Sequence, residues 1–94
     1  MGDKRLMAIM KVLPEGTEVD LDKLQEEIIK ALPEKFEVIK ETFKREYVAF
    51  GLEALQFRVF CPNYEGITDE LEDLLNNIPN VQRSEMLMMS LTKL

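Results

Sequence analysis

The sequence predicts an α+β fold in which two helices cover one face of a four-stranded antiparallel sheet. Apolar residues recur at helical spacing in only two segments, one in each half of the chain. The other structured segments are short and either continuously apolar or alternating, as strands are. A chain of 94 residues buries only roughly 60–65% of its unfolded surface, which is enough for one core. We therefore treat residues 1–94 as a single domain.

A buried strand and a helix are predicted in the first third of the chain. Residues 6–13 form a short, almost continuously apolar run that Pro14 and Gly16 bring to an end. Asp20 is placed to cap a helix, because its carboxylate can accept hydrogen bonds from the first free N–H groups. An apolar stripe with spacings of three and four then marks the helix face that packs on the sheet: Leu21, Leu24, Ile28, Ala31 and Leu32.

Two strands of different character follow. Residues 36–38 alternate between apolar and charged, and the looser run up to Lys44 carries three charges, as in an edge strand that resists pairing with other chains. The segment Val48–Gln56, which contains Phe50 and Gly51, is predicted to open the next strand. That strand has the period of two typical of half-buried strands, with Leu55, Phe57, Val59 and Cys61 on one side and Gln56 and Arg58 on the other.

A second helix and a closing strand are predicted in the last third of the chain. Residues 62–66 form a turn, and we expect Thr68 to cap the helix that follows. The apolar stripe of this helix comprises Ile67, Leu71, Leu74, Leu75 and Ile78. Residues 81–94 contain neither glycine nor proline and are predicted to form the last strand. Helix is the alternative there, because methionine and leucine have good helix propensity.

The order of these elements is β-α-β-β-α-β, which is the ferredoxin-like plan. In this plan, right-handed crossovers place the first and third strands in the centre of the sheet and both helices on one face. The almost wholly apolar run at residues 6–13 suits a central strand. The plan supports many unrelated functions, so function has to be inferred from particular residues.

The composition narrows the classes of partner. With 18 acidic and 12 basic residues the formal net charge is −6, so the phosphates of a nucleic acid would be repelled. We expect a protein partner and no direct contact with nucleic acid. Cys61 is the only cysteine and histidine is absent, which excludes an internal disulfide and a Cys/His zinc site. The apolar run at residues 6–13 is too short to span a bilayer, so we expect a cytoplasmic protein without membrane contact.

Acidic clusters are the main candidates for chemistry of the chain's own. Glu26 and Glu27, and the acidic residues among 69–73, could bind calcium or act as acid and base. A solvated helix face explains each cluster more simply, since neither converges on a histidine, a glycine-rich loop or a second acidic element. We therefore expect no metal site, no cofactor and no enzymatic reaction.

Two motifs carry a resemblance to a known family. A Phe-Gly-Leu-x-x-Leu-Gln pattern runs from Phe50 to Gln56, and a lysine, Lys93, stands one residue before the terminal Leu94. Both resemble the archaeal elongation factor 1-beta family and the exchange domain at the C-terminus of its eukaryotic counterparts. The resemblance covers nearly the whole chain, because it extends to residues 1–3, 11–15 and 19–21. From the residues alone, Phe50 is either part of the core or an exposed anchor for a partner; the resemblance favours the anchor.

The resemblance implies a guanine nucleotide exchange factor that promotes GDP-for-GTP exchange on the GTPase elongation factor 1-alpha in translation elongation. It implies that Lys93 competes with magnesium at the phosphate end of the nucleotide pocket. We expect the protein to be monomeric when free. The residues implied to bind the GTPase are Tyr47, Ala49, Phe50, Gly51, Gln56 and Leu94.

Two other classes of function remain open at this point. A ferredoxin-like regulatory or small-ligand-binding module would act as a stable homodimer. A small acid/base enzyme would turn over a substrate without any GTPase. The absence of histidine, and of an anion-binding glycine loop after the first strand, argues against the enzyme.

Overall fold

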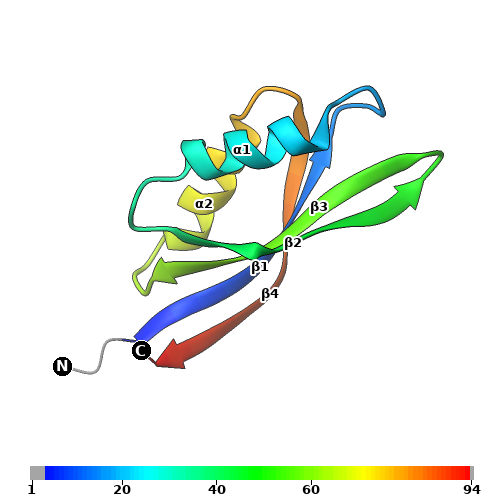
Figure 1. Ribbon diagram of the computed structural model, residues 1–94. Coiled ribbons are helices and arrows are strands. Elements are labelled where there is room, and N and C mark those ends of the chain that lie inside the picture. Colours follow the sequence, from blue (N-terminus) through cyan, green and yellow to red (C-terminus); the bar gives the residue numbers. More distant parts are fainter. Residues whose placement is uncertain (1–3, 94) are drawn as a thin grey trace.

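The protein folds into the predicted order of strands and helices. The computed structural model describes residues 4–93 (Figure 1). The elements are β1 (Lys4–Pro14), α1 (Leu21–Ala31), β2 (Glu37–Ala49), β3 (Leu52–Pro62), α2 (Ile67–Asn76) and β4 (Val81–Lys93). The strand prediction for the end of the chain is confirmed as far as Lys93, and the helical alternative is wrong.

The four strands form one antiparallel sheet in the order β2-β3-β1-β4. The first and third strands are central and the charged second strand is at an edge, as predicted. Figure 1 shows α1 and α2 on the same face of the sheet, which confirms the ferredoxin-like plan. In the part of the chain that the structure describes, the opposite face carries no helix, and we call it the open face. Within residues 4–93 neither helix is long or apolar enough to cross a membrane.

The core lies between the two helices and the sheet. Alternate residues of β1 and β3 point toward the helices, and the apolar stripes of α1 and α2 cover them. Each large aliphatic or aromatic side chain buried in this way contributes about 1.5–3 kcal/mol relative to exposure. Among the described residues no polar or charged side chain is buried. The central members of the core are Met10, Val12, Leu24, Ile28, Leu55, Phe57, Val59, Leu71 and Leu75.

The two helices begin in different ways. The Asp20 carboxylate accepts hydrogen bonds from the backbone N–H groups of Asp22 at 2.9 Å and Lys23 at 3.4 Å, so the predicted cap of α1 is confirmed. The predicted cap of α2 by Thr68 is wrong. Gly66 occupies the cap position with a φ of 87° and no side-chain hydrogen bond. The Gly66 carbonyl accepts the first helical hydrogen bond, from the Glu70 N–H at 3.0 Å, so the buried Ile67 is already the first residue of the helix.

The β2–β3 hairpin also differs from the prediction. Val48 and Ala49 belong to the end of β2, and β3 starts only at Leu52. Phe50 and Gly51 therefore form the turn between two strands rather than the opening of the third strand. The hairpin extends well beyond the helices (Figure 1), and the molecule measures 47 × 21 × 19 Å along its principal axes.

Candidate functional site

The tip of the β2–β3 hairpin is a two-residue turn. Ala49 and Leu52 are paired across its base, with Phe50 and Gly51 between them. The φ angles of Phe50 and Gly51 are 54° and 81°. Positive φ at both central positions gives a turn whose twist matches that of the strands it joins. Glycine adopts this conformation without cost, which explains Gly51.

Phe50 is unusual at its position. A bulky residue with positive φ is rare, and such a conformation costs on the order of 1–3 kcal/mol. The side chain gains nothing in return within the domain, because 98% of its surface is exposed. Phe50 is therefore not a core residue, and the alternative left open by the sequence is settled in favour of exposure.

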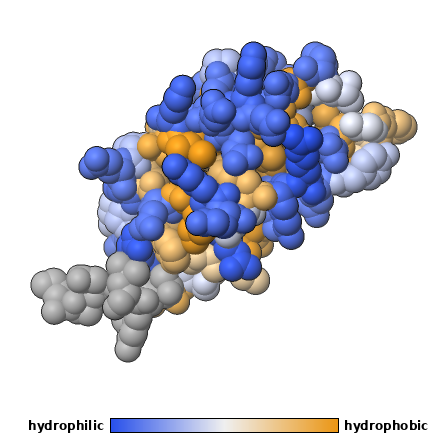
Figure 2. Space-filling view, viewed as in Figure 1, coloured by the Kyte–Doolittle hydropathy of each residue, from blue (hydrophilic) through white to orange (hydrophobic). Residues whose placement is uncertain are grey.

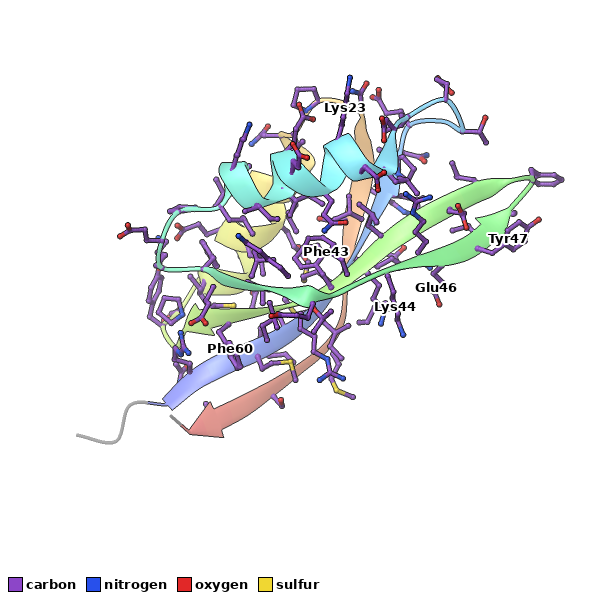
Figure 3. The ribbon with its side chains drawn as sticks, viewed as in Figure 1. Lys23, Phe43, Lys44, Glu46, Tyr47 and Phe60 are labelled. Carbon is purple, nitrogen blue, oxygen red and sulfur yellow. The ribbon has the colours of Figure 1, made fainter. Side chains whose placement is uncertain are left out.

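Other exposed apolar side chains surround Phe50. Tyr47 and Val48 lie near the end of β2. The side chain of Tyr47 is 67% exposed, and that of Val48 is also exposed. Tyr47 projects from the far end of the hairpin in Figure 3, and Figure 2 shows hydrophobic colour at the same end of the molecule. We call Tyr47, Val48 and Phe50 the apolar tip. Ala49 is partly buried at the base of the turn.

A polar cleft of about 340 Å³ lies beside the hairpin. Its walls come from the segment between β1 and α1, the first residues of α1, and the strands near the turn. The guanidinium of Arg45 lies 2.8 Å from the carboxylate of Asp22, which ties β2 to the start of α1. Both side chains are exposed, so this ion pair contributes at most about 1 kcal/mol to stability.

Gln56 lies away from the apolar tip. It is on the open face of β3, where it is paired with Lys11 of β1 on one side and Lys44 of β2 on the other. It is four positions along β3 from Leu52, which corresponds to roughly 13 Å along a strand. The structure therefore brings Tyr47, Phe50 and Gly51 together but leaves Gln56 in the middle of the sheet.

The last strand places Lys93 at the other end of the molecule. The backbone of Lys93 is paired with Lys4, at the start of the central strand β1. Figure 1 shows this end of β4 and the hairpin turn at opposite ends of the molecule. Leu94 and the side chain of Lys93 lie outside the described residues. Two of the predicted site residues, Phe50 and Lys93, are thus far apart.

Other reactive groups do not converge. Burial raises the pKa of the Cys61 thiol to about 11, so it is protonated at neutral pH and a poor nucleophile. Within residues 4–93 no group of three or more acidic, cysteine or histidine side chains is arranged to hold a metal ion. The hairpin tip and the end of β4 remain the places to consider.

Sequence reasoning missed the surroundings of Gln56. Lys11, Lys44 and Arg58 come from three different strands and lie around it on the open face. The period of two could place Arg58 and Gln56 on one side of β3, but only the pairing register shows which residues of the other strands join them.

Comparison with known proteins gives one family. The model of the EF-1 guanine nucleotide exchange domain matches residues 7–92. The chain is 40% identical over 87 residues to the elongation factor 1-beta of Thermococcus onnurineus, covering 92% of this chain and 93% of that protein. It is 43% identical over 82 residues to the elongation factor 1-beta of Sulfolobus acidocaldarius, covering 86% and 89%. The elongation factor 1-beta of Staphylothermus marinus is 40% identical over 83 residues, covering 87% and 90%.

Proposed function

The chain belongs to the EF-1 guanine nucleotide exchange domain family, and on that premise we propose that it accelerates GDP-for-GTP exchange on elongation factor 1-alpha during translation elongation. The observation that best supports this within the molecule is Phe50, an almost fully exposed aromatic ring held at positive φ on a short turn. Backbone strain that no contact within the domain compensates is typical of a binding site. We place this activity in the cytoplasm and expect the free protein to be a monomer.

Exchange of this kind follows from thermodynamic linkage. A protein that binds the GTPase most tightly when nucleotide and magnesium are absent must weaken the binding of both, by the same factor. The exchange domain then needs no substrate, cofactor or covalent chemistry of its own. It needs a contact that holds the GTPase and a group that disturbs the nucleotide site.

The apolar tip is suited to hold the GTPase. Aromatic side chains dominate the energetics of protein interfaces, and Phe50 and Tyr47 are already presented to solvent. The turn between β2 and β3 is only two residues long, which restricts the backbone conformations of the hairpin tip. A preorganised hairpin loses less conformational entropy on binding, which increases affinity.

Lys93 is our candidate for the group that disturbs the nucleotide site. Magnesium bridges the nucleotide phosphates and is held by few protein ligands. A lysine ammonium is a compact positive charge that can compete with the cation for those phosphates. The backbone of Lys93 is paired with Lys4 of the central strand β1, so the edge strand β4 is held in the sheet as far as this residue. The GTPase would be contacted at both ends of the domain at once.

Release of a fluorescent GDP analogue from the cognate elongation factor 1-alpha tests the proposal. We expect catalytic amounts of this protein to accelerate release, and excess magnesium to reduce the effect because the metal is the competitor. The Phe50→Ala variant serves as the control for the binding surface. An unchanged release rate at stoichiometric concentrations of the wild-type protein would contradict the proposal.

A further inference from the structure

The open face of the sheet has an irregular centre. Strand β2 is paired regularly with β3 up to Ile39 and again from Lys44, and residues 40–43 of β2 lie opposite the single residue Phe57. Phe43 stacks on Phe57 on the helix side, with ring centroids 4.8 Å apart. Figure 3 shows Phe43 pointing toward α1, whereas Lys44 and Glu46 point to the other side of β2. The bulge therefore fills the core with Phe43 and reshapes the open face.

The hydroxyl of Thr42 stabilises this bulge. It accepts a hydrogen bond from the backbone N–H of Arg58 at 2.9 Å and donates one to the carbonyl of Ile39 at 2.6 Å. The hydroxyl thus replaces a missing contact of the strand ladder. The result is a hollow of about 220 Å³ lined by Ile9, Thr42, Lys44, Gln56, Phe57 and Arg58. We call it the Gln56 hollow.

The cations of the Gln56 hollow have no counterion in the described part of the chain. Within residues 4–93 neither Lys44 nor Arg58 has a carboxylate within 4 Å. Both side chains are exposed. Lys11, on the next strand, is paired only loosely, with its ammonium 3.8 Å from the carboxylate of Glu46. Lys11, Lys44 and Arg58 outnumber the two nearby carboxylates, Glu46 and Glu85, although the net charge of the chain is −6.

Neighbouring cations with no counterion repel one another. Lys44 is directly opposite Gln56, and Arg58 is two residues further along the same face of β3, so the two cations are diagonal neighbours. An anion bound between them would relieve this repulsion. The Gln56 side chain offers an amide donor at the same place, and Ile9 provides an apolar wall. The hollow therefore has the chemistry to receive a carboxylate.

We propose that the Gln56 hollow receives an acidic segment of elongation factor 1-alpha. This is a third contact with the GTPase, located between the apolar tip and Lys93, and it rests on the proposed function. The hollow lies between those two ends. Gln56 is roughly 13 Å along β3 from the turn, and Ile9 is roughly 17 Å along β1 from Lys4. A partner that touches both ends passes along the sheet, and the helices cover only its other face.

A matched pair of double charge reversals tests the proposal. Lys44→Glu with Arg58→Glu removes the cations of the hollow. Lys23→Glu with Lys30→Glu changes the net charge equally but on the exposed face of α1. The rate constant for association with GDP-bound elongation factor 1-alpha is measured by stopped flow at several salt concentrations, and thermal melting checks that both variants are folded.

The expected result is specific to the hollow. We expect the Lys44/Arg58 reversal to lower the association rate constant about tenfold or more at low salt, since electrostatic complementarity acts mainly on association. The difference should shrink at high salt, where exposed charges are screened. The Lys23/Lys30 reversal should stay within about twofold of wild type. A Lys44→Gln/Arg58→Gln variant should fall between wild type and the reversal.

The contrary results separate the two proposals. If wild type binds the GTPase and both reversals associate equally fast, the hollow is not a contact and only this proposal is overturned. If wild type does not bind the GTPase at all, the proposed function is overturned and this proposal with it. Binding of a short single-stranded RNA that the Lys44/Arg58 reversal abolishes, with an unchanged GTPase rate, would assign the hollow to nucleic acid instead.

Discussion

At the scale of single residues, Phe50 is a position where the requirements of stability and of the proposed function differ. Its backbone is held at a φ of 54° and its ring is almost fully solvated. Asparagine tolerates positive φ far better than phenylalanine does, and Asn-Gly is a preferred sequence for such a turn. The residue present is therefore a poor choice for the turn and a good choice for binding a partner.

We predict that Phe50→Asn raises the free energy of unfolding by about 1 kcal/mol, because it relieves the strain of the turn. The same change should lower exchange activity on elongation factor 1-alpha at least tenfold, because the aromatic anchor is lost. Urea denaturation and release of fluorescent GDP measure the two effects. Phe50→Ala should also cost little stability, whereas a core phenylalanine would cost about 3–5 kcal/mol. A loss of that size in either variant would contradict the exposed anchor.

At the scale of elements, the starts of the two helices give a paired prediction. Asp20→Ala removes the carboxylate that accepts from two backbone N–H groups of α1 and should cost about 1 kcal/mol of stability. Thr68→Ala should change stability by less than about 0.5 kcal/mol, because α2 starts after Gly66 and has no side-chain cap. Chemical denaturation of both variants measures the difference. Equal losses would mean that Thr68 caps α2 after all.

A second element-level feature joins α2 to the segment before β2. The ammonium of Lys35 contacts the carboxylate of Glu70 and donates to the Tyr64 hydroxyl at 2.8 Å, and that hydroxyl donates to Glu70 at 3.0 Å. The hydrogen bond from Lys35 lowers the pKa of Glu70, and Tyr64 adds to the effect. The hydrogen bond with Glu70 raises the pKa of Lys35.

The two pKa shifts make stability depend on pH in opposite directions. Glu70, with its pKa lowered, stabilises the fold above its unfolded pKa, and this contribution is lost as pH falls through the lowered value. Lys35, with its pKa raised, contributes below its unfolded pKa and loses this as pH rises through the raised value. We predict that NMR titration finds the Glu70 carboxyl below the ordinary glutamate range and that Lys35→Met moves its pKa upward. An unchanged Glu70 midpoint in Lys35→Met would rule out the pairing.

At the scale of the whole molecule, the proposed function assigns separate tasks to the two ends of the sheet. The apolar tip and the end of β4 lie at opposite ends of a body 47 Å long. Residues so far apart share no contacts, and their effects on a common process add independently. Because of this separation, the proposed binding of the GTPase and the proposed disturbance of its nucleotide site can be tested by separate substitutions.

We predict that Lys93→Ala removes most exchange activity while the variant still binds elongation factor 1-alpha through the apolar tip. The free energy of unfolding should change by less than about 1 kcal/mol, since single surface charges contribute little. Lys93→Arg should recover activity only in part, because a planar guanidinium replaces a compact ammonium. In the double variant with Phe50→Ala, the losses in log exchange rate should add. Full activity in Lys93→Ala would show that the hairpin and the sheet alone perform the exchange.

Local patterns along the chain are sufficient to predict most helices and strands of this protein. Apolar periodicity is a local property, so it located both helices, the two central strands and the charged edge strand, and the Asp20 cap is a contact between near neighbours. The Phe-Gly and lysine motifs also indicated the family, and the match of residues 7–92 to the exchange domain confirmed it.

How these elements meet could not be predicted from local patterns. Whether Phe50 was core or surface depended on where β2 ended, and the pairing of β2 with β3 sets that end. Lys11, Lys44 and Arg58 lie around Gln56 only because of the pairing register of the strands. A register shift of one residue in a strand would move its side chains to the other face of the sheet. These outcomes escaped prediction because each results from contacts between residues distant in the chain, where packing against the core outweighs the local preference of any one segment.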